Sequence, residues 1–475
     1  MFDQSFSLTN FEAIFNLELR RGRIDFNGMP QDYKDVVANI RWTKSAMATQ
    51  RRKKLATWTE DEKKDYENNR GLLKIYIEQK EEIVKQVLGQ LAAQVNTTAF
   101  RFGITSYMYG TKECFTIDAA DRAQFYAMKA LQRNVVKAFK VEMLNRHTVM
   151  QNLKLQMNTN LPIYIIRTDV SSFFESIKHE RLFALIDRNS VLSVKSKEMT
   201  KNIIREYDRV KNTALVPKEQ GVPRGIGISS PLSEIYMSDI DKELKGRKEV
   251  IFYSRYVDDI FIILAYLPQQ MKLDKYYQNL EQKFKEDYGL TLQPIGSAKC
   301  ELHDLYNHIL GVPRNQIMSY LGYKLYVDGI DDRKVRFGLS DDRKARFKGR
   351  VDHAFERFGH VVKVDIKQAK RDFRDAINLI TGNIRLSKAK SGVKVGFYYN
   401  NDLLDKDGDF QELEDYLKSK ALPIPANLFA SAADRTAFEK KLKTWINSIS
   451  LRDRWKERQT FDINYERLRE IERWL

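Results

Sequence analysis

Two adjacent aspartates lie between two apolar runs in the middle of the chain. Asp258 and Asp259 follow VIFYSRY and precede IFIILAYL, so a tight hairpin turn would present both carboxylates from a buried scaffold. Unpaired, the two acids would repel each other and be costly to desolvate, and a bound divalent cation resolves both problems. A solvent-exposed turn is the alternative, and the flanking hydrophobicity makes it the weaker interpretation.

A third acid, Asp169, ends the β-branched run YIIRT. If the strand that it ends lies beside those around Asp258 and Asp259, the three carboxylates form a hard, oxygen-only ligand set. Such a set suits two Mg²⁺ ions about 3.5 to 4 Å apart, one activating an attacking hydroxyl and one neutralising a leaving phosphate. The pattern therefore predicts two-metal chemistry at a phosphate.

The elements that must position these acids are of mixed type. From Leu161 to Tyr326, strands alternate with helices, which indicates an α+β core. Before it, Thr98 to Ile117 predicts two short strands around a turn at Gly110, followed by a long helix with apolar residues at 3-to-4 spacing. Residues 1 to about 90 and the chain from about 331 onward are predicted to be mainly helical.

Composition narrows the functional classes. The chain has 475 residues with a formal net charge of +17, and its 43% hydrophobic residues suffice for a folded core. The positive excess points to a polyanionic partner. Cys114 and Cys300 cannot form a disulfide framework or a CxxC zinc ribbon, so a reducing, cytoplasmic location is expected. No export signal is predicted, because the N-terminus has Asp3 where basic residues are needed and no uninterrupted apolar stretch. No membrane span is predicted, because charged residues interrupt the most apolar segment, 250–267.

Five segments resemble the motifs of reverse transcriptases, in the order of that family. YVDD (256–259) and DVSSFFESI (169–177) resemble its two metal-binding motifs. QGVPRGIGISSPLSEIYM (220–237) is similar to the glycine-rich segment that shapes the nucleotide pocket and enters a helix. GLTLQPIGSAK (289–299) resembles the motif whose lysine faces pyrophosphate, and SYLGYKL (319–325) resembles the primer-grip hairpin.

The resemblance implies an α+β, right-hand polymerase fold with fingers, palm and thumb. The basic thumb is expected where 15 Lys and Arg stand against 7 Asp and Glu, in residues 341–400. The implied division of the chain is a helical N-terminal extension (1–95), fingers and palm (96–330, with the palm core at 161–330), the thumb (331–400) and a helical C-terminal region (401–475).

The resemblance also implies the roles of individual residues. Asp169, Asp258 and Asp259 would bind two Mg²⁺ ions, joined by the Val170 carbonyl, and Lys299 would be the general acid. Phe174 matches the aromatic gate that rejects a 2′-hydroxyl and so favours deoxynucleotides. The alternative is a core phenylalanine, and because Phe173 is adjacent, one ring is expected in the core and the other at the gate.

Two features depart from the family pattern or leave it ambiguous. Pro223-Arg224-Gly225 stands where most of the family has Pro-Gln-Gly, so Arg224 and Gly225 are expected at the nucleotide, with a fixed cation near the incoming triphosphate or the template. In KECFTIDAADRAQ (112–124), Lys112 is the first choice for the basic residue that binds the triphosphate, and Arg101 is the second.

The flanking segments indicate the branch of the family. QSFSLTNFEAIFNLELRRG near the start and residues 379–404 resemble bacterial defence-associated and abortive-infection reverse transcriptases, and the N-terminal stretch is similar to the first polymerase of the type 3 defence system. That resemblance implies a non-coding RNA template, dNTPs as substrates, a repetitive DNA product, a second reverse transcriptase subunit as partner and a homo- or hetero-oligomer.

Two other functions stay open at this stage. One is a retron or group II intron-type reverse transcriptase that serves element mobility or small-DNA synthesis. The other is a catalytically inactive RNA-binding scaffold, against which the intact Asp169, Asp258, Asp259 and Lys299 argue.

Overall fold

The computed structural model describes residues 2–21, 24, 26, 28–52, 58–118, 121–142, 145–158, 163–211, 218–305, 316–328, 334–386, 394–405 and 408–475. These residues form two compact units, each assembled from separate stretches of chain. The first unit consists of Met1–Met143, Val170–Leu244 and Asn279–Leu292, and the second consists of Leu144–Asp169, Lys245–Gln278 and Gln293–Leu475. The predicted division at residues 330/331 lies outside the described residues, and the four-part division stays a prediction.

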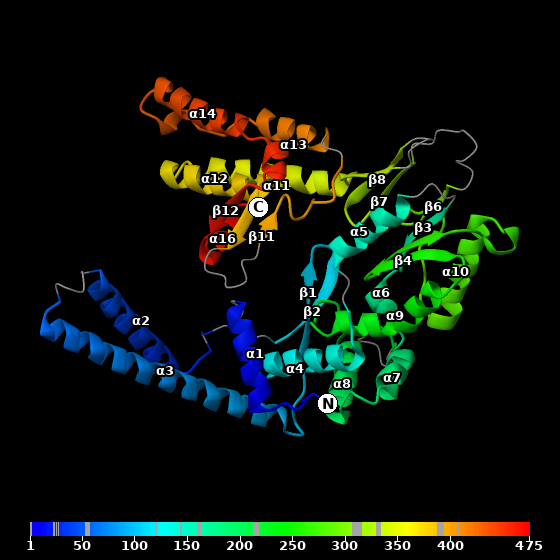
Figure 1. Cartoon of the computed structure of the whole chain (residues 1–475), viewed down its shortest axis with the longest axis horizontal. Helices are drawn as coiled ribbons and strands as arrows, with labels where there is room; N and C mark the ends of the chain where they lie inside the picture. Colours follow the sequence, from blue (N-terminus) through cyan, green and yellow to red (C-terminus); the bar gives the residue numbers. More distant parts are fainter. Residues whose placement is uncertain are drawn as a thin grey trace. The chain divides into compact units, whose positions relative to one another are not determined.

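The N-terminal part of the first unit is helical, as predicted. Its helices are α1 (Leu8–Arg20), α2 (Gln31–Arg51) and α3 (Glu60–Val95), and α2 and α3 lie side by side (Figure 1). α3 starts at a capping box in which Thr59 and Glu62 satisfy each other's backbone N–H groups. The buried apolar residues of α3 lie in its last turns, from Val84 to Val95, whereas Leu72 and Ile75 are 40% and 49% exposed.

The rest of the first unit contains one hairpin and further helices. β1 (Ile104–Tyr109) and β2 (Lys112–Ile117) pair in antiparallel fashion around Gly110, whose φ of +60° suits glycine. Asp121 caps α4 by accepting from the backbone N–H groups of Ala123 and Gln124. The helices are α4 (Arg122–Phe139), α6 (Phe173–Ser176), α7 (His179–Arg188), α8 (Val194–Lys211) and α9 (Ser229–Lys245).

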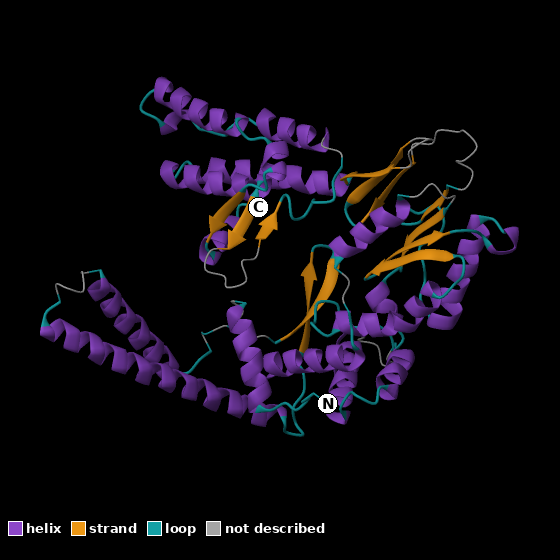
Figure 2. Ribbon diagram, viewed as in Figure 1, coloured by secondary structure: helices purple, strands orange, loops and turns teal. Residues whose placement is uncertain are grey.

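The sheet that carries the predicted metal ligands belongs to the second unit. Its strands are ordered β4-β5-β3-β6 and are visible as arrows in Figure 2. β-Branched and aromatic residues favour these extended segments, and their side chains are largely buried. The strands are β3 (Tyr164–Asp169), β4 (Val250–Tyr256), β5 (Asp259–Leu264) and β6 (Glu301–Asp304), accompanied by α5 (Arg146–Met157), η2 (Pro268–Gln270) and the start of α10 (Leu273–Tyr288), whose residues from Asn279 onward belong to the first unit.

The C-terminal half of the second unit is mainly helical, as predicted, but it also contains two three-stranded sheets. The first is ordered β7-β8-β9, with β7 (Gln316–Tyr320), β8 (Tyr323–Asp328) and β9 (Lys334–Leu339). The second, ordered β11-β10-β12, was not predicted from the sequence; it contains β10 (Asn383–Leu386), β11 (Lys394–Gly396) and β12 (Thr460–Ile463). The helices are α11 (Asp341–Val361), α12 (Ile366–Thr381), α13 (Gly408–Ser419), η4 (Ala426–Leu428), α14 (Ala432–Asn447), α15 (Leu451–Lys456) and α16 (Tyr465–Glu472).

One hydrophobic core joins strands β3 and β5 to the C-terminal helices within the second unit. It includes Phe261 of β5, Phe337 of β9 and Phe373 of α12, all fully buried. Shared burial of this kind fixes the frame on which the acidic residues are held. Among the described helices, none combines the length and the apolar character that crossing a membrane requires.

Candidate active site

Strand pairing brings the predicted acids together. In the register of the sheet, Asp169 at the end of β3 lies opposite Asp259 at the start of β5, and Asp259 also pairs with Tyr256 of β4. Val257 and Asp258 therefore form the two-residue turn between β4 and β5, as predicted. Asp169 and Asp259, 90 positions apart in sequence, thus meet at one end of the sheet.

The turn between β4 and β5 is strained. Val257 has a φ of +61°, a conformation that β-branched residues rarely adopt. The buried Arg255 holds it there, because its Nη1 donates to the Val257 carbonyl oxygen at 2.7 Å. Strain that the surrounding structure maintains is typical of functional sites, and here it fixes the backbone that carries Asp258.

Asp169 is buried and only half satisfied. Its Oδ2 accepts a hydrogen bond from Lys299 Nζ at 2.5 Å, whereas its buried Oδ1 has no hydrogen-bond partner. Lys299 reaches the acid because Gln293 N donates to the Asp169 carbonyl oxygen at 3.1 Å, which places the segment after it beside β3. A buried oxygen without a donor is costly, and a cation would remove that cost.

Asp259 has a strongly perturbed acidity. Burial raises the pKa of its carboxyl to about 6, the cation of Arg167 opposes this shift, and the neighbouring Asp258 and Asp169 add to it. Arg167 Nη2 lies 3.7 Å from Asp259 Oδ1, too far for a hydrogen bond, while Arg167 Nη1 donates to Glu301 Oε1 at 2.7 Å. The acid is therefore underneutralised by its surroundings.

Sequence reasoning missed Arg167 and Glu301. Strand alternation contained a signal for the first, because Arg167 and Asp169 are two residues apart on β3 and so lie on the same face of the sheet. Glu301 had no comparable signal, since its position depends on the pairing of β6 with β3, in which it lies opposite Arg167.

The chemistry of this cluster fits a hard divalent cation. Three carboxylates supply oxygen ligands only, and Oδ1 of Asp169 is a buried acceptor without a hydrogen-bond donor. Among the described residues, however, no three His, Cys, Asp or Glu side chains converge into a preformed metal cage. The Lys299 ammonium lies on the other oxygen of Asp169 and partly neutralises it.

The predicted gate residues lie together in the first unit. Phe173 is buried and Phe174 is partly exposed, and the gate role of Phe174 stays a prediction. The Arg224 guanidinium lies 5.2 Å from the centre of the Phe174 ring, and its Nη2 donates to both carboxylate oxygens of Glu175, at 3.1 and 3.2 Å. The charge of Arg224 is thus directed at Glu175.

Gly225 is required by a close approach of two backbones. Its φ is +105°, and a Cβ atom there would lie 2.7 Å from the carbonyl oxygen of Phe115 in β2. Val170, predicted to lend its carbonyl to the metal ions, is buried and forms an isolated β-bridge with Leu292. The binding roles of both residues stay predictions.

The two candidates for the triphosphate-binding cation differ in their surroundings. Lys112 is exposed at the first position of β2, next to the hairpin turn. Arg101 donates from Nη1 to the carbonyl oxygens of Thr98 and Phe100, at 2.9 and 2.7 Å, so its guanidinium is partly committed to the local backbone. These surroundings leave Lys112 as the first choice, and neither residue is shown to bind a nucleotide.

The segment that resembles the primer grip forms the β7–β8 hairpin. Leu321 and Gly322 make its turn, with φ values of +44° and +79°, and Arg146 Nε donates to the Leu321 carbonyl oxygen at 2.6 Å. Buried Tyr320 packs on Phe261 of β5, with ring centroids 4.9 Å apart. The hairpin is therefore anchored on the strand that begins with Asp259.

A basic groove of about 710 Å³ lies in the second unit, which we call the arginine groove. Arg146 and Arg343 lie over the ring of Tyr323, at 5.2 and 4.7 Å, and one buried terminal nitrogen of Arg146 has no hydrogen-bond partner. Its charged lining consists of Arg146, Arg343, Arg346, Arg350 and Glu472. Four guanidinium groups against one carboxylate suit a phosphate backbone.

The strands that carry the three aspartates lie within a segment that matches a known protein family. Residues 122–325 match the family described as reverse transcriptase (RNA-dependent DNA polymerase). The chain contains a reverse transcriptase domain. That domain is the catalytic domain of RNA-directed DNA polymerases, so the predictions of an α+β, right-hand polymerase fold and of an enzyme domain of this type are confirmed. Reverse transcriptases generally use divalent metal ions, which agrees with the ligand set of the palm.

The individual proteins that this chain is similar to are distant relatives. The retron Ec83 reverse transcriptase of Escherichia coli is 29% identical over 155 residues, and the match covers 28% of this chain and 44% of the relative. The structure of apo telomerase from Candida tropicalis has a TM-score of 0.34 and 14% identity, covering 54% of this chain and 60% of that chain. Telomerase from Candida albicans with a fragment of telomeric RNA has a TM-score of 0.34 and 11% identity, covering 82% and 76%.

Proposed function

We propose that the chain is an RNA-directed DNA polymerase that transfers nucleotides from dNTPs to a primer hydroxyl. The observation that supports this proposal most directly is the cross-strand pair of Asp169 and Asp259, beside a strained turn that carries Asp258. The orphaned Oδ1 of Asp169 and the raised pKa of Asp259 describe a site that is short of positive charge. A reverse transcriptase domain around that site defines the reaction class.

Asp169, Asp258 and Asp259 would hold the two Mg²⁺ ions, with the Val170 carbonyl as a further ligand. When bound, the ions supply charge neutralisation at the triphosphate and activation of the attacking hydroxyl. Arg167 lies between Asp259 and Glu301 and keeps the Asp259 side chain at the edge of the sheet.

Lys299 is suited to protonate the leaving pyrophosphate. The hydrogen bond to Asp169 raises the pKa of its ammonium above the ordinary value, so the proton is retained at neutral pH until the leaving group takes it. The side chain is 60% exposed and can therefore reach a substrate. Phe174 limits the space at the sugar, and Lys112, Arg224 and Gly225 complete the predicted nucleotide pocket.

The template, the product and the biological role are inferred from sequence resemblance. The segments at 379–404 and near the N-terminus favour a bacterial defence enzyme of the type 3 kind, with a non-coding RNA template, a repetitive DNA product and a second reverse transcriptase subunit. Residues 387–393 of the first segment lie outside the described part of the chain. The arginine groove supports binding of a nucleic-acid backbone by the predicted basic thumb.

The second candidate is a retron-type enzyme that makes a small DNA for another purpose. It is favoured by the retron Ec83 relative, whose match with this chain covers less than half of that protein. Incorporation by the purified protein with its co-purified RNA, given single dNTPs and pairs of dNTPs, separates the two. A product that needs only a subset of dNTPs supports the defence function, and a product that needs all four supports the retron-type function.

The reaction is tested by the variant Asp258→Asn. We expect DNA synthesis to fall by about 1000-fold or more, equivalent to about 4 kcal/mol, because the carboxylate ligand is lost. Binding of RNA is expected to remain within about twofold, since Asp258 holds metal and not backbone. Asp274→Asn, at an exposed acid in the first turn of α10, is the control. Retained synthesis in Asp258→Asn would refute the two-metal assignment.

A further inference from the structure

We infer that Arg224 is a positioning residue for the sugar gate, held by Glu175 and lying against the ring of Phe174. The inference rests on the proposed function, because the gate acts only in nucleotide selection. It assigns to Arg224 a different task from a cation that contacts the triphosphate. We call Arg224, Glu175 and Phe174 the gate clamp.

The first observation is the placement of the guanidinium. Arg224 Nη2 donates to Oε1 and Oε2 of Glu175 at 3.1 and 3.2 Å, so the positive charge already has a carboxylate partner. The same guanidinium lies 5.2 Å from the centre of the Phe174 ring, within the range of a cation–π contact. The side chains of Arg224 and Glu175 are only 26% and 33% exposed, so the attraction between their charges is stronger than in an ion pair on the open surface.

The second observation is that the backbone on both sides of the contact is fixed. Val222 N donates to the Phe174 carbonyl oxygen at 2.8 Å, and Gly221 N donates to that of Ile177 at 2.7 Å. Phe115 N of β2 donates to the Arg224 carbonyl oxygen at 2.7 Å. The glycine-rich segment is therefore attached to the gate helix α6 and to β2 at the same time.

The third observation concerns the start of α6. Ser172, immediately before Phe173, has a φ of +46° and serves as the N-cap, but its side chain makes no capping hydrogen bond. A four-residue helix with such a start has little intrinsic stability. Phe173 is held by burial, whereas the partly exposed Phe174 ring lies between the Phe173 ring, with centroids 5.6 Å apart, and the Arg224 guanidinium as its two aromatic and cationic contacts.

These contacts explain the departure from Pro-Gln-Gly. A glutamine at position 224 could hydrogen-bond to Glu175, but it could not place a planar cation on the Phe174 ring. A ring held in one orientation excludes a 2′-hydroxyl more sharply than a ring that moves. The chain therefore uses Arg224 to sharpen the choice between deoxynucleotides and ribonucleotides.

The experiment compares kcat/KM for a dNTP and for the matching rNTP on one RNA template. We expect Arg224→Gln and Glu175→Gln each to reduce the preference for the dNTP by about threefold to tenfold, as the loss of one partly buried cation–π contact allows. The KM for the dNTP is expected to change by less than about twofold. Phe174→Ala, which removes the ring itself, should reduce the preference for the dNTP further. Its effect marks the largest loss of preference that a change at Arg224 or Glu175 can cause.

Two further variants make the experiment decisive. Arg224→Lys keeps the charge but loses the planar group, so it is expected not to restore the preference. Arg209→Gln removes the exposed guanidinium that pairs with Glu206 on α8 and is the matched control. Thermal melting of every variant identifies those that do not fold, and Glu175→Gln is the least disruptive change of the set.

Each outcome separates the inference from the proposed function. An unchanged preference in folded Arg224→Gln and Glu175→Gln overturns the inference, as does full rescue by Arg224→Lys or a rise in the KM for the dNTP with the preference intact. The last two results would indicate a cation that binds phosphate. No incorporation by the wild-type protein on any RNA template would count against the proposed function instead.

Discussion

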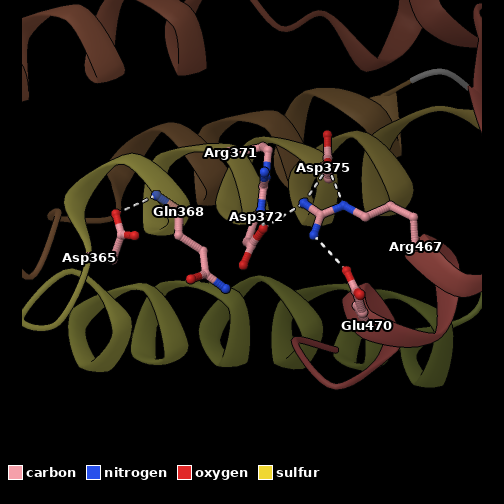
Figure 3. A network of polar contacts seen from close by, with 7 residues as sticks. All are labelled: Asp365, Gln368, Arg371, Asp372, Asp375, Arg467 and Glu470. Carbon is pink, nitrogen blue, oxygen red and sulfur yellow. Dashed lines mark hydrogen bonds and ion pairs between the residues drawn. The ribbon is translucent and has the colours of Figure 1, made fainter.

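Two clusters of acids in the second unit differ in how their charge is balanced. The palm cluster consists of Asp169, Asp258 and Asp259, with Arg167, Lys299 and Glu301 around them. The Arg467 network consists of Arg467, Asp372, Asp375 and Glu470, and it connects α12 to α16 (Figure 3). Both clusters bring several carboxylates close to arginine or lysine, but only in the Arg467 network do the acids form close ion pairs with the protein's own cations.

In the Arg467 network, one guanidinium serves three acids. Arg467 Nη2 lies 2.6 Å from both Asp372 Oδ1 and Asp375 Oδ2, and its Nη1 donates to Glu470 at 3.0 Å. Burial alone would lower the pKa of Arg467, but its hydrogen bonds to Asp375 and Asp372 raise it above the ordinary value. The network therefore stabilises its own charges and has a structural role.

In the palm cluster, by contrast, the carboxylates lack sufficient positive charge and hydrogen-bond donors. Burial raises the pKa of Asp259 to about 6, and Oδ1 of Asp169 has no donor. The nearest cations do not complete the site, because Arg167 stays 3.7 Å from Asp259 and Lys299 is mostly exposed. Clustered acids therefore indicate a functional site when the pKa of a carboxyl group is raised and a buried carboxylate oxygen has no hydrogen-bond partner.

The largest effect on stability is expected from breaking the Arg467 network. Arg467→Met leaves the buried Asp372 with only the 3.5 Å contact from the exposed Arg371, and we expect the free energy of unfolding to fall by about 3 kcal/mol. The control is Arg385→Met, since Arg385 and Asp462 form an ion pair in which both side chains are 52% exposed; there we expect less than about 1 kcal/mol. Urea unfolding measures both variants, and equal losses would contradict the comparison.

The next effect is expected at Lys299 and concerns catalysis rather than stability. Lys299→Met should lower the rate of nucleotide incorporation by about 100-fold, because the proposed proton donor is lost. The free energy of unfolding should change by less than about 1 kcal/mol, because the lysine is 60% exposed. Single-turnover incorporation and urea unfolding test the two statements. A stability loss as large as that of Arg467→Met would show that the palm cation is structural.

The smallest effect is expected from Asp259→Asn in metal-free protein. A carboxyl whose folded-state pKa is raised stabilises the fold below its unfolded pKa of 3.8, and this contribution is lost as the pH rises through about 6. The variant should therefore be more stable than the wild type by about 1 kcal/mol at pH 7.5, with the difference vanishing near pH 4. Melting in EDTA across this range measures it, and a wild type that is the more stable at pH 7.5 would contradict the assignment.

Local sequence signals predicted the elements that carry the palm acids. The apolar runs around Asp258 and Asp259 became β4 and β5, and the run before Asp169 became β3. Asp121 and Arg122 mark the start of α4, as the motif indicated. These features depend on periodicity, turn composition and helix capping, which act over a few residues.

Side-chain contacts between distant segments were not predictable in the same way. Arg224 was expected near a triphosphate or template, and its contact with Glu175, 49 positions away, depends on how the glycine-rich segment folds onto α6. The sheet β11-β10-β12 was missed because β10 and β12 pair in parallel across 77 positions, as the Arg385–Asp462 contact illustrates. Such pairings are decided by packing and register and leave little local trace.

The sequence by itself determined the three aspartates, the lysine after them, the order of the motifs and the resemblance to reverse transcriptases. Only the tertiary structure decided that Asp169 faces Asp259, that Arg167 and Glu301 flank them, that one oxygen of Asp169 is left without a donor, and that Arg224 lies over the ring of Phe174. The physical reason is that residue types are chosen locally, whereas burial and the balance of charge arise only when separate segments pack together.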